Sequence, residues 1–408
     1  MKVMALLGLV ALTFSASHRG AVPVTAPGPS GAGSVSPPGD SGPLPVPAGL
    51  EPRIAFWIDI YTRYTTRQAV LHDEEYPQVI YGVIDLGEAP DEGPEFPDAD
   101  EEIMEKARQR VAEIIRRQEQ QEKSLAILSE EEQLVRDALA LLPAEERGRR
   151  AAGRVRSQRG LQDRFLKGLI RSGRYLRRFR SIAREEGVPE DLAYLPHVES
   201  SFQGDARSHA GATGLWQFMR STGRRYLTID DVLDERFDPF LSAHAAFRYL
   251  HENYIALGSW PLAVTAYNHG LAGMRRAQKR FGQDLQAIIQ SYRARSFGFA
   301  SKNFYAEFLA ARRIAHRPKE WFGKLRLDPP VQFRTLVLPE YALAGEFCRH
   351  FALDLDRLRR LNPALSASVW KGKRLLPRGY PLRLPVSEAE RIARGWSNLP
   401  ATARFSRQ

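Results

Sequence analysis

Cysteine is almost absent from the sequence, which holds a single one, Cys348, among 408 residues. One cysteine excludes an intrachain disulfide, so the fold must be stabilised by its hydrophobic core. Cys348 lies between Phe347 and Arg349 with apolar residues close by in the chain. A small, soft side chain in such surroundings is typical of a buried structural thiol.

Long hydrophobic runs are also missing. The apolar run of residues 3–14 is too short for a bilayer core of roughly 30 Å, which needs about 20 apolar residues. Lys2 precedes this run and Ser15-Ala16-Ser17 follows it, the pattern of a secretory signal peptide over residues 1–17. An N-terminal anchor that is never removed is the alternative. Cys348 is far from this region, so we do not expect a lipoprotein.

Acidic residues are outnumbered, since 59 lysines and arginines face 48 aspartates and glutamates, giving a net charge of +11. A basic surface suits any polyanion, so charge alone does not choose between nucleic acid, anionic lipid and a carboxylate-bearing cell wall. With 43% hydrophobic residues the chain can bury a core, and its length predicts two or three compact units.

The chain divides by composition. Residues 18–50 contain eight prolines and seven glycines, which predicts a disordered linker. Residues 51–159 are expected to form a helical extension that serves as a scaffold. Apolar residues recur there at three- and four-residue spacing in two stripes, Ile103, Ala107, Val111, Ile114 and Ile115, then Leu134, Val135, Ala138 and Leu142.

Strand-like alternation is nearly absent from residues 160–325, where Val188-Pro189, Asp238-Pro239 and Trp260-Pro261 mark helix starts. This segment should be all-α or nearly so. After Pro330 the pattern changes, with one strand near Thr335, two short helices and a closing strand ending near Leu384. Residues 333–386 are therefore expected to form a small β-α-α-β module, followed by a tail over residues 387–408.

Three clusters combine polar residues with glycine or buried-type apolar residues. They are Glu199-Ser200-Ser201-Phe202, then Gly211-Ala212-Thr213-Gly214-Leu215-Trp216-Gln217-Phe218-Met219, then Ala266-Tyr267-Asn268-His269-Gly270. Each is weak alone. A glutamate near a helix end is usually a solvated charge, the second run fits a buried turn, and Gly270 is a common helix terminator.

The order of the three clusters resembles the lytic transglycosylases of glycoside hydrolase family 23, the goose-lysozyme-like superfamily. Their pattern is Glu-Ser-x-Phe, Gly-Leu-(Met/Trp)-Gln-(Phe/Ile) and Ala-Tyr-Asn-x-Gly, and the membrane-bound lytic murein transglycosylase D group is the most similar. The linking segment Asp234-Glu235-Arg236-Phe237-Asp238-Pro239 also resembles the family. The likeness is strong over residues 160–316 and moderate over 53–90. It implies a mainly α protein with a lysozyme-like catalytic domain over residues 160–325.

The resemblance also implies the chemistry. Glycosidic cleavage needs a proton on the leaving oxygen while positive charge builds at the anomeric carbon. Glu199 would be that acid, protonated in apolar surroundings. It would then act as base on the sugar's C6 hydroxyl, giving 1,6-anhydro-N-acetylmuramic acid without water. Tyr267 would orient the carboxyl and contact substrate with Ser200, Gln217, Asn268, Phe218 and Met219. The nearby acids Asp234, Glu235 and Asp238 are interpreted as cap and linker residues.

Two departures from the family stand out. Position 269 is a histidine where a small residue is usual. Ala300-Ser301-Lys302-Asn303-Phe304-Tyr305 replaces a Glu-Thr-Arg-Asn-Tyr stretch, so the acid is missing although Asn303 and Tyr305 could still reach the cleft.

The C-terminal module resembles LysM, a fold that binds N-acetylglucosamine-containing glycans, through Leu361-Asn362-Pro363 and Gly379-Tyr380-Pro381. The usual Gly-Asp-Thr-Leu turn is replaced by residues 340–343, so glycan binding and a purely structural role stay open.

The predicted function is cleavage of the MurNAc–GlcNAc β-1,4 bond of peptidoglycan strands in the periplasm or cell envelope, with peripheral envelope association. The alternatives are a muramidase of the same fold and a non-catalytic wall-binding scaffold. No cofactor is expected, and His244 and His251 lack a His-Glu-x-x-His partner motif, so no metal is expected either. The arginines of residues 171–184 are interpreted as one basic helix face, and no recognised nucleic-acid-binding fold accompanies them in an exported protein, so nucleic acid is not expected as a partner.

Overall fold

The computed structural model describes residues 42–87, 98–120 and 128–405. The predicted signal peptide and residues 18–41 of the predicted linker lie outside these ranges. The chain divides into two compact units. Unit 1 comprises Met1–Leu166 and Ser259–Phe322, and unit 2 comprises Lys167–Gly258 and Gly323–Gln408. The segment expected as one catalytic domain, residues 160–325, is therefore divided between them.

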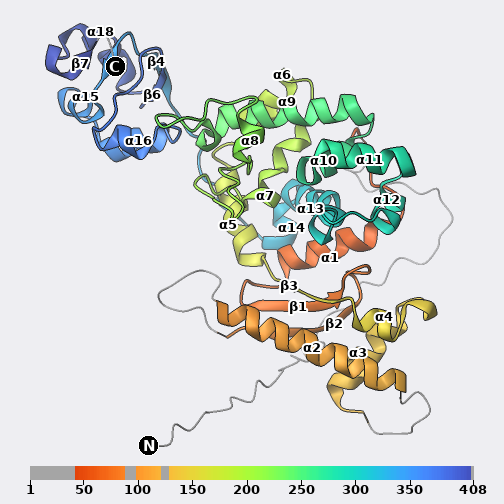
Figure 1. Ribbon diagram of the computed structural model, residues 1–408. Helices are drawn as coiled ribbons and strands as arrows, with labels where there is room; N and C mark the ends of the chain where they lie inside the picture. The colour runs from red at the N-terminus through yellow and green to blue at the C-terminus, as the bar shows by residue number, and fades with distance from the viewer. Residues whose placement is uncertain (1–41, 88–97, 121–127, 406–408) are drawn as a thin grey trace, which may run out of the picture. The chain divides into compact units, whose positions relative to one another are not determined.

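The fold is mainly α, as predicted (Figure 1). The helices of unit 1 come from two segments of the chain, one before residue 167 and one after residue 258. They are α1 (Glu51–Thr62), α2 (Asp98–Gln120), α3 (Glu130–Ala140) and α4 (Arg149–Ala152), then α10 (Trp260–His269), α11 (Leu271–Phe281), α12 (Leu285–Ser291), α13 (Phe299–His316) and α14 (Pro318–Phe322). Helix α5 (Gln162–Ser172) crosses from unit 1 into unit 2.

Unit 1 also contains a three-stranded antiparallel sheet that the sequence analysis missed. Its order is β2 (Ile80–Asp85), β1 (Gln68–Asp73), β3 (Val155–Arg159), with Val70 opposite both Val83 and Gln158. The central strand β1 is buried on both faces, and its apolar part, Ala69 to Leu71, is only three residues long. Periodicity alone cannot distinguish such a run from a buried helix segment. The region is therefore a sheet with helices rather than a purely helical extension.

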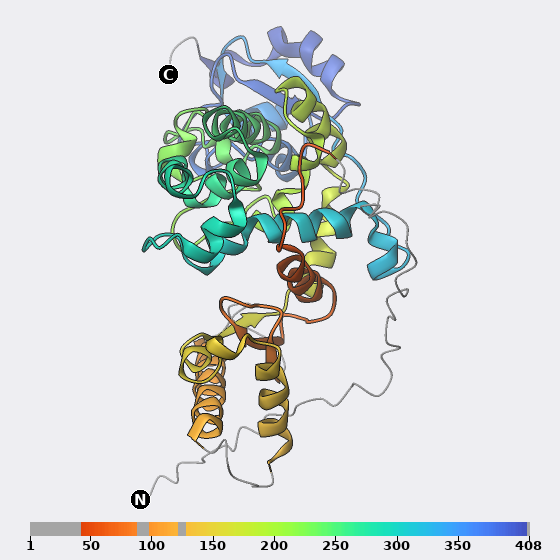
Figure 2. The same ribbon diagram turned by 90° about the vertical axis from the view of Figure 1, so that its right-hand side faces the viewer.

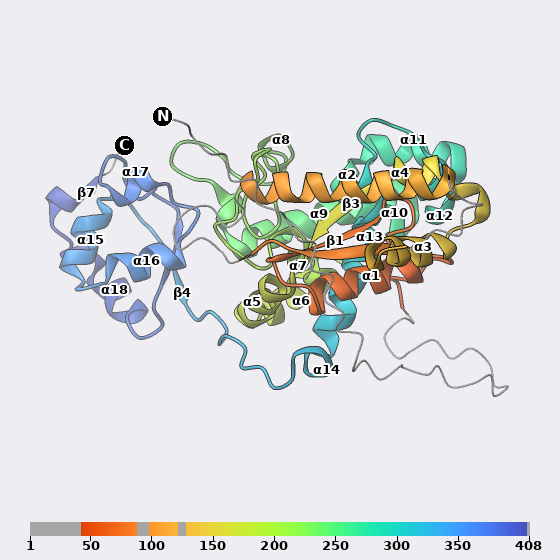
Figure 3. The same cartoon turned by 90° about the horizontal axis from the view of Figure 1, so that it is seen from below.

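Helices α2 and α3 lie side by side and cover one face of this sheet (Figures 2 and 3). The predicted stripe of α2 is confirmed, since Ala107, Val111, Ile114 and Ile115 are buried in the shared core. On α3 the prediction holds for Val135 and Ala138 but is wrong for Leu134, which is 44% exposed. Ser129 begins α3 with a capping box that it shares with Glu132.

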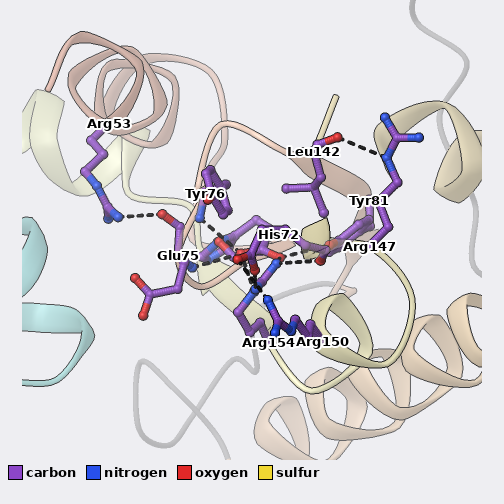
Figure 4. A network of polar contacts seen from close by, with 11 residues as sticks. Arg53, His72, Glu75, Tyr76, Tyr81, Leu142, Arg147, Arg150 and Arg154 are labelled. Carbon is purple, nitrogen blue, oxygen red and sulfur yellow. Dashed lines mark hydrogen bonds and ion pairs between the residues drawn. The ribbon is translucent and has the colours of Figure 1, made fainter. Parts of the chain in front are cut away.

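A buried carboxylate, Asp73, organises the end of strand β1. Its partners Glu75, Tyr76, Tyr81 and Arg154 are labelled in Figure 4. Its oxygens accept hydrogen bonds from the backbone N–H of Glu75 at 2.9 Å, from that of Tyr76 at 3.0 Å and from the Tyr81 hydroxyl at 3.2 Å. Arg154 forms an ion pair with Asp73 at 3.0 Å and another with Glu146. We call this cluster the Asp73 network. It stabilises the sheet because each buried charge faces an opposite one.

Helix α13 is the other organising element of unit 1, and α1 packs along it. Buried Arg53 on α1 donates a hydrogen bond of 3.0 Å to Oδ1 of Asn303. The Tyr305 hydroxyl donates to the carbonyl oxygen of Pro45 at 2.8 Å. These contacts fix the chain before and within α1 onto α13.

Unit 2 contains the remaining helices and the C-terminal module. Before the module come α6 (Leu176–Glu185), α7 (Pro196–Glu199), α8 (Arg220–Gly223) and α9 (Pro239–Leu257). The module contains β4 (Arg334–Val337), β5 (Tyr341–Ala342), α15 (Ala344–His350), α16 (Leu355–Leu361), α17 (Ala367–Trp370), β6 (Pro381–Leu384), α18 (Ala389–Gly395) and β7 (Arg404–Phe405). Strands β4 and β6 pair antiparallel, with Arg334 opposite Leu384.

Residues after 387 were assigned to a tail, and the structure instead gives them α18 and β7. Ile392, Trp396 and Leu399 belong to the core of the module, together with the predicted buried thiol Cys348. No helix within the described ranges is both long and apolar enough to span a membrane.

Candidate active site

Glu199 is the last residue of the short helix α7, which begins with Pro196 at its first position. The chain reverses directly afterwards. The backbone N–H groups of Ser200 and Phe202 both donate to the carbonyl oxygen of Pro196, at 3.1 and 3.0 Å. Ser201 and Phe202 take the left-handed conformation, with φ of 49° and 57°. Non-glycine residues rarely adopt it, so residues 196–202, the Glu199 turn, hold local backbone strain.

Helix α5 braces this turn. The Arg171 guanidinium donates two hydrogen bonds to the carbonyl oxygen of Ser201, at 3.2 Å from Nε and 2.7 Å from Nη2. Gly168, one turn earlier, is so close that an added Cβ would lie 3.0 Å from the same oxygen. The strained carbonyl is therefore held by a charged donor and by close backbone packing.

Ser200 connects the first sequence motif to the second. Its hydroxyl donates to the carbonyl oxygen of Leu215 at 2.8 Å, and the side chain is only 4% exposed. The serine was expected to contact the sugar. The structure shows it holding the Leu215 segment next to Glu199.

The second motif folds into a tight turn. Thr213 and Phe218 form an antiparallel bridge, and Gln217 between them has φ of 48°. The Gln217 amide nitrogen donates to the carbonyl oxygen of Gly214 at 2.8 Å. Trp216 and Phe218 are buried, whereas Met219 is 41% exposed. Of the two apolar residues predicted to contact substrate here, Phe218 belongs to the core and Met219 faces outward.

Arg236 of the linking segment holds this turn in place, and the sequence analysis gave it no role. The guanidinium is buried, pairs with Asp234 at 2.7 Å and donates to the carbonyl oxygens of Gly211 and Phe218, both at 3.2 Å. Gly214 has φ of 80°, and a Cβ there would overlap the carbonyl oxygen of Arg236. An arginine between two acids in a loop is the one sequence signal for this contact.

The acids of the linking segment act as caps, as interpreted. Asp234 caps the short 3-10 helix Glu235–Phe237. Asp238 caps α9, accepting from the backbone N–H groups of Phe240 and Leu241 at 2.9 Å each. Glu235 accepts from the backbone N–H of Thr228 at 2.7 Å, and burial raises its pKa.

The third motif lies in unit 1, at the end of α10. Tyr267 is half-buried and Asn268 is exposed. The Asn268 carbonyl oxygen accepts a hydrogen bond of 2.7 Å from the Ser301 hydroxyl on α13. Gly270 ends the helix with φ of 91°. His269, the departure from the family pattern, lies with its ring centroid 4.9 Å from that of Phe297.

Helix α13 differs from expectation in two respects. Asn303 and Tyr305 do not reach a cleft, because both are buried and bonded to Arg53 and Pro45. The helix also carries half-buried Glu307, whose pKa desolvation raises to about 8. The sequence gave no signal for this, since Glu307 lies outside every motif.

The predicted residues thus fall into two sets. Unit 2 brings together Glu199, Ser200 and Gln217, with Met219 nearby in the chain, and unit 1 carries Tyr267 and Asn268. Within the described residues no three His, Cys, Asp or Glu side chains are grouped as metal ligands.

Residues 179–289 match the family model "Transglycosylase SLT domain". The matched segment includes the predicted site residues of both sets. We call this matched segment the SLT domain. All three sequence motifs and the linking segment fall inside it. Glu199 therefore lies within the segment that matches this family model.

The SLT domain is similar to known proteins over short stretches. One relative, "Membrane-bound lytic murein transglycosylase D" of Escherichia coli (strain K12), is 39% identical over 98 residues. That alignment covers 24% of this chain and 22% of the relative, so the chain spans about a fifth of that protein.

Two solved structures are also similar. The lytic transglycosylase Slt of Pseudomonas aeruginosa has a TM-score of 0.30 at 20% identity, covering 37% of this chain and 26% of that one. The 70 kDa soluble lytic transglycosylase of Escherichia coli has a TM-score of 0.29 at 19% identity, covering 37% and 27%.

Proposed function

We propose that the protein is a lytic transglycosylase of peptidoglycan, with Glu199 as its single acid and base. The observation that carries the proposal is the Glu199 turn inside the SLT domain. A strained backbone places the carboxyl at the end of α7, and Arg171 and Ser200 hold that backbone. Strain of about 1–3 kcal/mol per residue persists only where the surroundings enforce it, and it clusters at active sites.

The proposed reaction uses one carboxyl twice. Protonated Glu199 transfers its proton to the β-1,4 glycosidic oxygen as the bond to C1 of N-acetylmuramic acid breaks. The resulting carboxylate then accepts the proton of that sugar's C6 hydroxyl as O6 forms a bond to C1. The products are a chain ending in N-acetylglucosamine with a free hydroxyl and a chain ending in 1,6-anhydro-N-acetylmuramic acid. The enzyme returns to its protonated state and no water is consumed.

The other site residues are assigned by their chemistry. The family resemblance assigns to Tyr267 the role of orienting the catalytic carboxyl, and to the Gln217 and Asn268 amides the binding of the sugar's N-acetyl group. Met219 offers an exposed apolar contact. Ser200 contributes by position, since its hydroxyl hydrogen is donated to Leu215. The protein would act in the periplasm or envelope, delivered there by residues 1–17.

The C-terminal module is proposed to be LysM-like and to support unit 2 structurally. Its turn over residues 340–343 is covered, because β5 pairs with β7 and the Leu343 N–H donates to the Ala403 carbonyl oxygen at 3.0 Å. The opposite loop also contacts the SLT domain, where the Asp234 N–H donates to the Ala364 carbonyl oxygen at 2.8 Å. These contacts favour support over sugar binding through that turn.

Mass spectrometry of products from purified peptidoglycan tests the proposal. Digestion by the full chain should release muropeptides with 1,6-anhydro ends. Reducing ends alone would identify a muramidase of the same fold, and the absence of soluble products would identify a wall-binding scaffold.

A further inference from the structure

A concave site lies in unit 2, and none of its lining residues belongs to the three sequence motifs. It is a cavity of about 690 Å³ between helix α6 and the segment that leads into the C-terminal module. Its wall carries five arginines and no acid. The arginines are Arg174, Arg177, Arg178, Arg184 and Arg334. We call this cavity the arginine pocket.

Helical spacing explains how the arginines gather. Arg174 and Arg178 are four residues apart, and Arg177, Ser181 and Arg184 follow one another at four and three. Residues at these spacings share one face of a helix, so Arg177, Arg178 and Arg184 of α6 form one basic wall, and Arg174 extends it from the turn before the helix. Arg334 faces it from β4.

The segment of residues 330–334 forms the opposite wall of the pocket. Direct contacts hold it to Arg174, in the turn before α6. Val331 donates its N–H to the Arg174 carbonyl oxygen at 3.2 Å, and Asp328 pairs with the Arg174 side chain at 2.7 Å. Phe240 and Phe333 line the pocket with ring centroids 5.7 Å apart, and the Arg383 guanidinium lies over both rings. Arg383 is itself fixed by a buried ion pair with Asp238 at 2.7 Å. The pocket is therefore preformed.

The charges in the pocket are poorly compensated. Arg178 and Arg184 pair with Glu185 and Glu190 at 3.6 and 2.8 Å, but all four side chains are well exposed. Such surface pairs contribute about 0–1 kcal/mol, so a ligand can replace them. Within the described residues, Arg177 and Arg334 form no ion pair at all. Grouped like charges without acids are unfavourable alone and attract an anion.

We propose that the arginine pocket binds the carboxylates of a short acidic peptide, the stem peptide of peptidoglycan. Arginine forks bind carboxylates in a bidentate manner. The rings of Phe240 and Phe333 supply apolar contact for the peptide's side chains. The cavity volume lies in the range of about 300–1,000 Å³ usual for small ligands, and a concave site suits a peptide better than a flat lipid surface. The choice of ligand rests on the proposed function, whereas the anion site does not.

Calorimetry with a free stem tetrapeptide that carries no sugar tests this proposal. The protein is the full chain with Glu199→Gln, which prevents digestion. The double variant Arg177→Gln/Arg334→Gln should bind about 10- to 100-fold more weakly, as expected for losing one or two charge-assisted hydrogen bonds. The matched control Arg359→Gln/Arg360→Gln removes the same charge from exposed arginines of α16 and should bind like the parent. Arg177→Lys, which retains charge without the fork, should lie between.

Three results would overturn the proposal: no peptide binding, equal weakening in the control, or binding only of inorganic phosphate or phosphatidylglycerol vesicles. Product analysis on the protein with intact Glu199 reports separately on the proposed function. Anhydro ends without peptide binding would refute the pocket alone. Peptide binding that depends on the pocket arginines, without any digestion of peptidoglycan, would refute the proposed enzyme activity and leave the pocket proposal standing.

Discussion

The Asp73 network of unit 1 and the Glu199 turn of unit 2 hold polar groups in opposite ways. In the Asp73 network the backbone is ordinary strand and turn, and the carboxylate is saturated by backbone N–H groups, a tyrosine and Arg154. In the Glu199 turn the backbone itself is strained at Ser201 and Phe202. There arginine donates to a carbonyl oxygen rather than to an acid. A network of paired charges stabilises a fold, whereas a strained turn needs the fold to stabilise it.

Breaking the Asp73 network should give the largest loss of stability. Asp73→Ala leaves Arg154 partly buried beside Glu146 alone, and breaking a buried pair costs about 3–5 kcal/mol. Urea unfolding combined with hydrogen exchange should locate the loss in β1, β2 and β3. Asp59→Ala, which removes an exposed i,i+4 pair with Arg63, should change stability by less than about 0.5 kcal/mol. Equal losses in both variants would show that the network is not special.

Gly214→Ala should give the next largest effect, in the turn that contacts the Glu199 turn. The new Cβ meets the Arg236 carbonyl oxygen, and the left-handed φ adds about 1–2 kcal/mol of strain. We expect a total loss of about 2–4 kcal/mol together with reduced digestion of peptidoglycan.

Gly211→Ala is the matched control, because Gly211 has φ of 87° but open space around it. It should show the φ strain alone. If the two variants were equally destabilised, close packing against Arg236 would not be what positions the second motif.

Over the first pH unit below about 6.5, acid titration should show the smallest of these effects, and the two regions should share it. Burial lowers the pKa of His72 and of His197 from 6.5 to about 3, so both histidines stay neutral in the folded protein. The unfolded chain takes up protons below pH 6.5. Stability is therefore fully present above that pH and falls as pH drops toward 3, by up to about 1.4 kcal/mol per pH unit for each histidine.

His197→Phe should remove one histidine's share of this slope from unit 2 and leave unit 1 unchanged. The readout is the pH dependence of hydrogen exchange in α7 and in β1. His209→Phe alters an exposed histidine and serves as the control. A slope that His197→Phe leaves intact would show that His197 does not stay neutral on folding.

Sequence patterns predicted the helices well where periodicity was long. The α2 stripe and the cap at Asp238 are correct because helical spacing and capping are local properties. The sheet of unit 1 was missed because β1 is buried on both faces and only six residues long, so it shows no alternation of apolar and polar residues. Leu134 was predicted to be buried because it stands next to Val135, and the sequence alone does not show which of the two side chains faces the core.

The sequence motifs name candidate site residues, but they do not show which contacts hold those residues in place. Glu199, Gln217 and Asn268 stand in motifs, whereas Arg171, Gly168 and Arg236 act through contacts with residues 18 to 33 positions away in the chain. Such contacts leave no pattern in a single sequence. The roles of Phe218 and Tyr305 were misjudged for the same reason, since motif membership does not reveal burial.

The central claim is that the Glu199 carboxyl cleaves the glycan. Glu199→Gln retains the shape of the side chain and removes the group that transfers protons, so the variant should fold normally and digest nothing. The most direct measurement is release of 1,6-anhydro muropeptides from purified peptidoglycan by the parent and by Glu199→Gln. We predict anhydro products from the parent and a loss of at least about 100-fold in the variant, the lower range for a general acid–base. Equal release by both proteins would contradict the account.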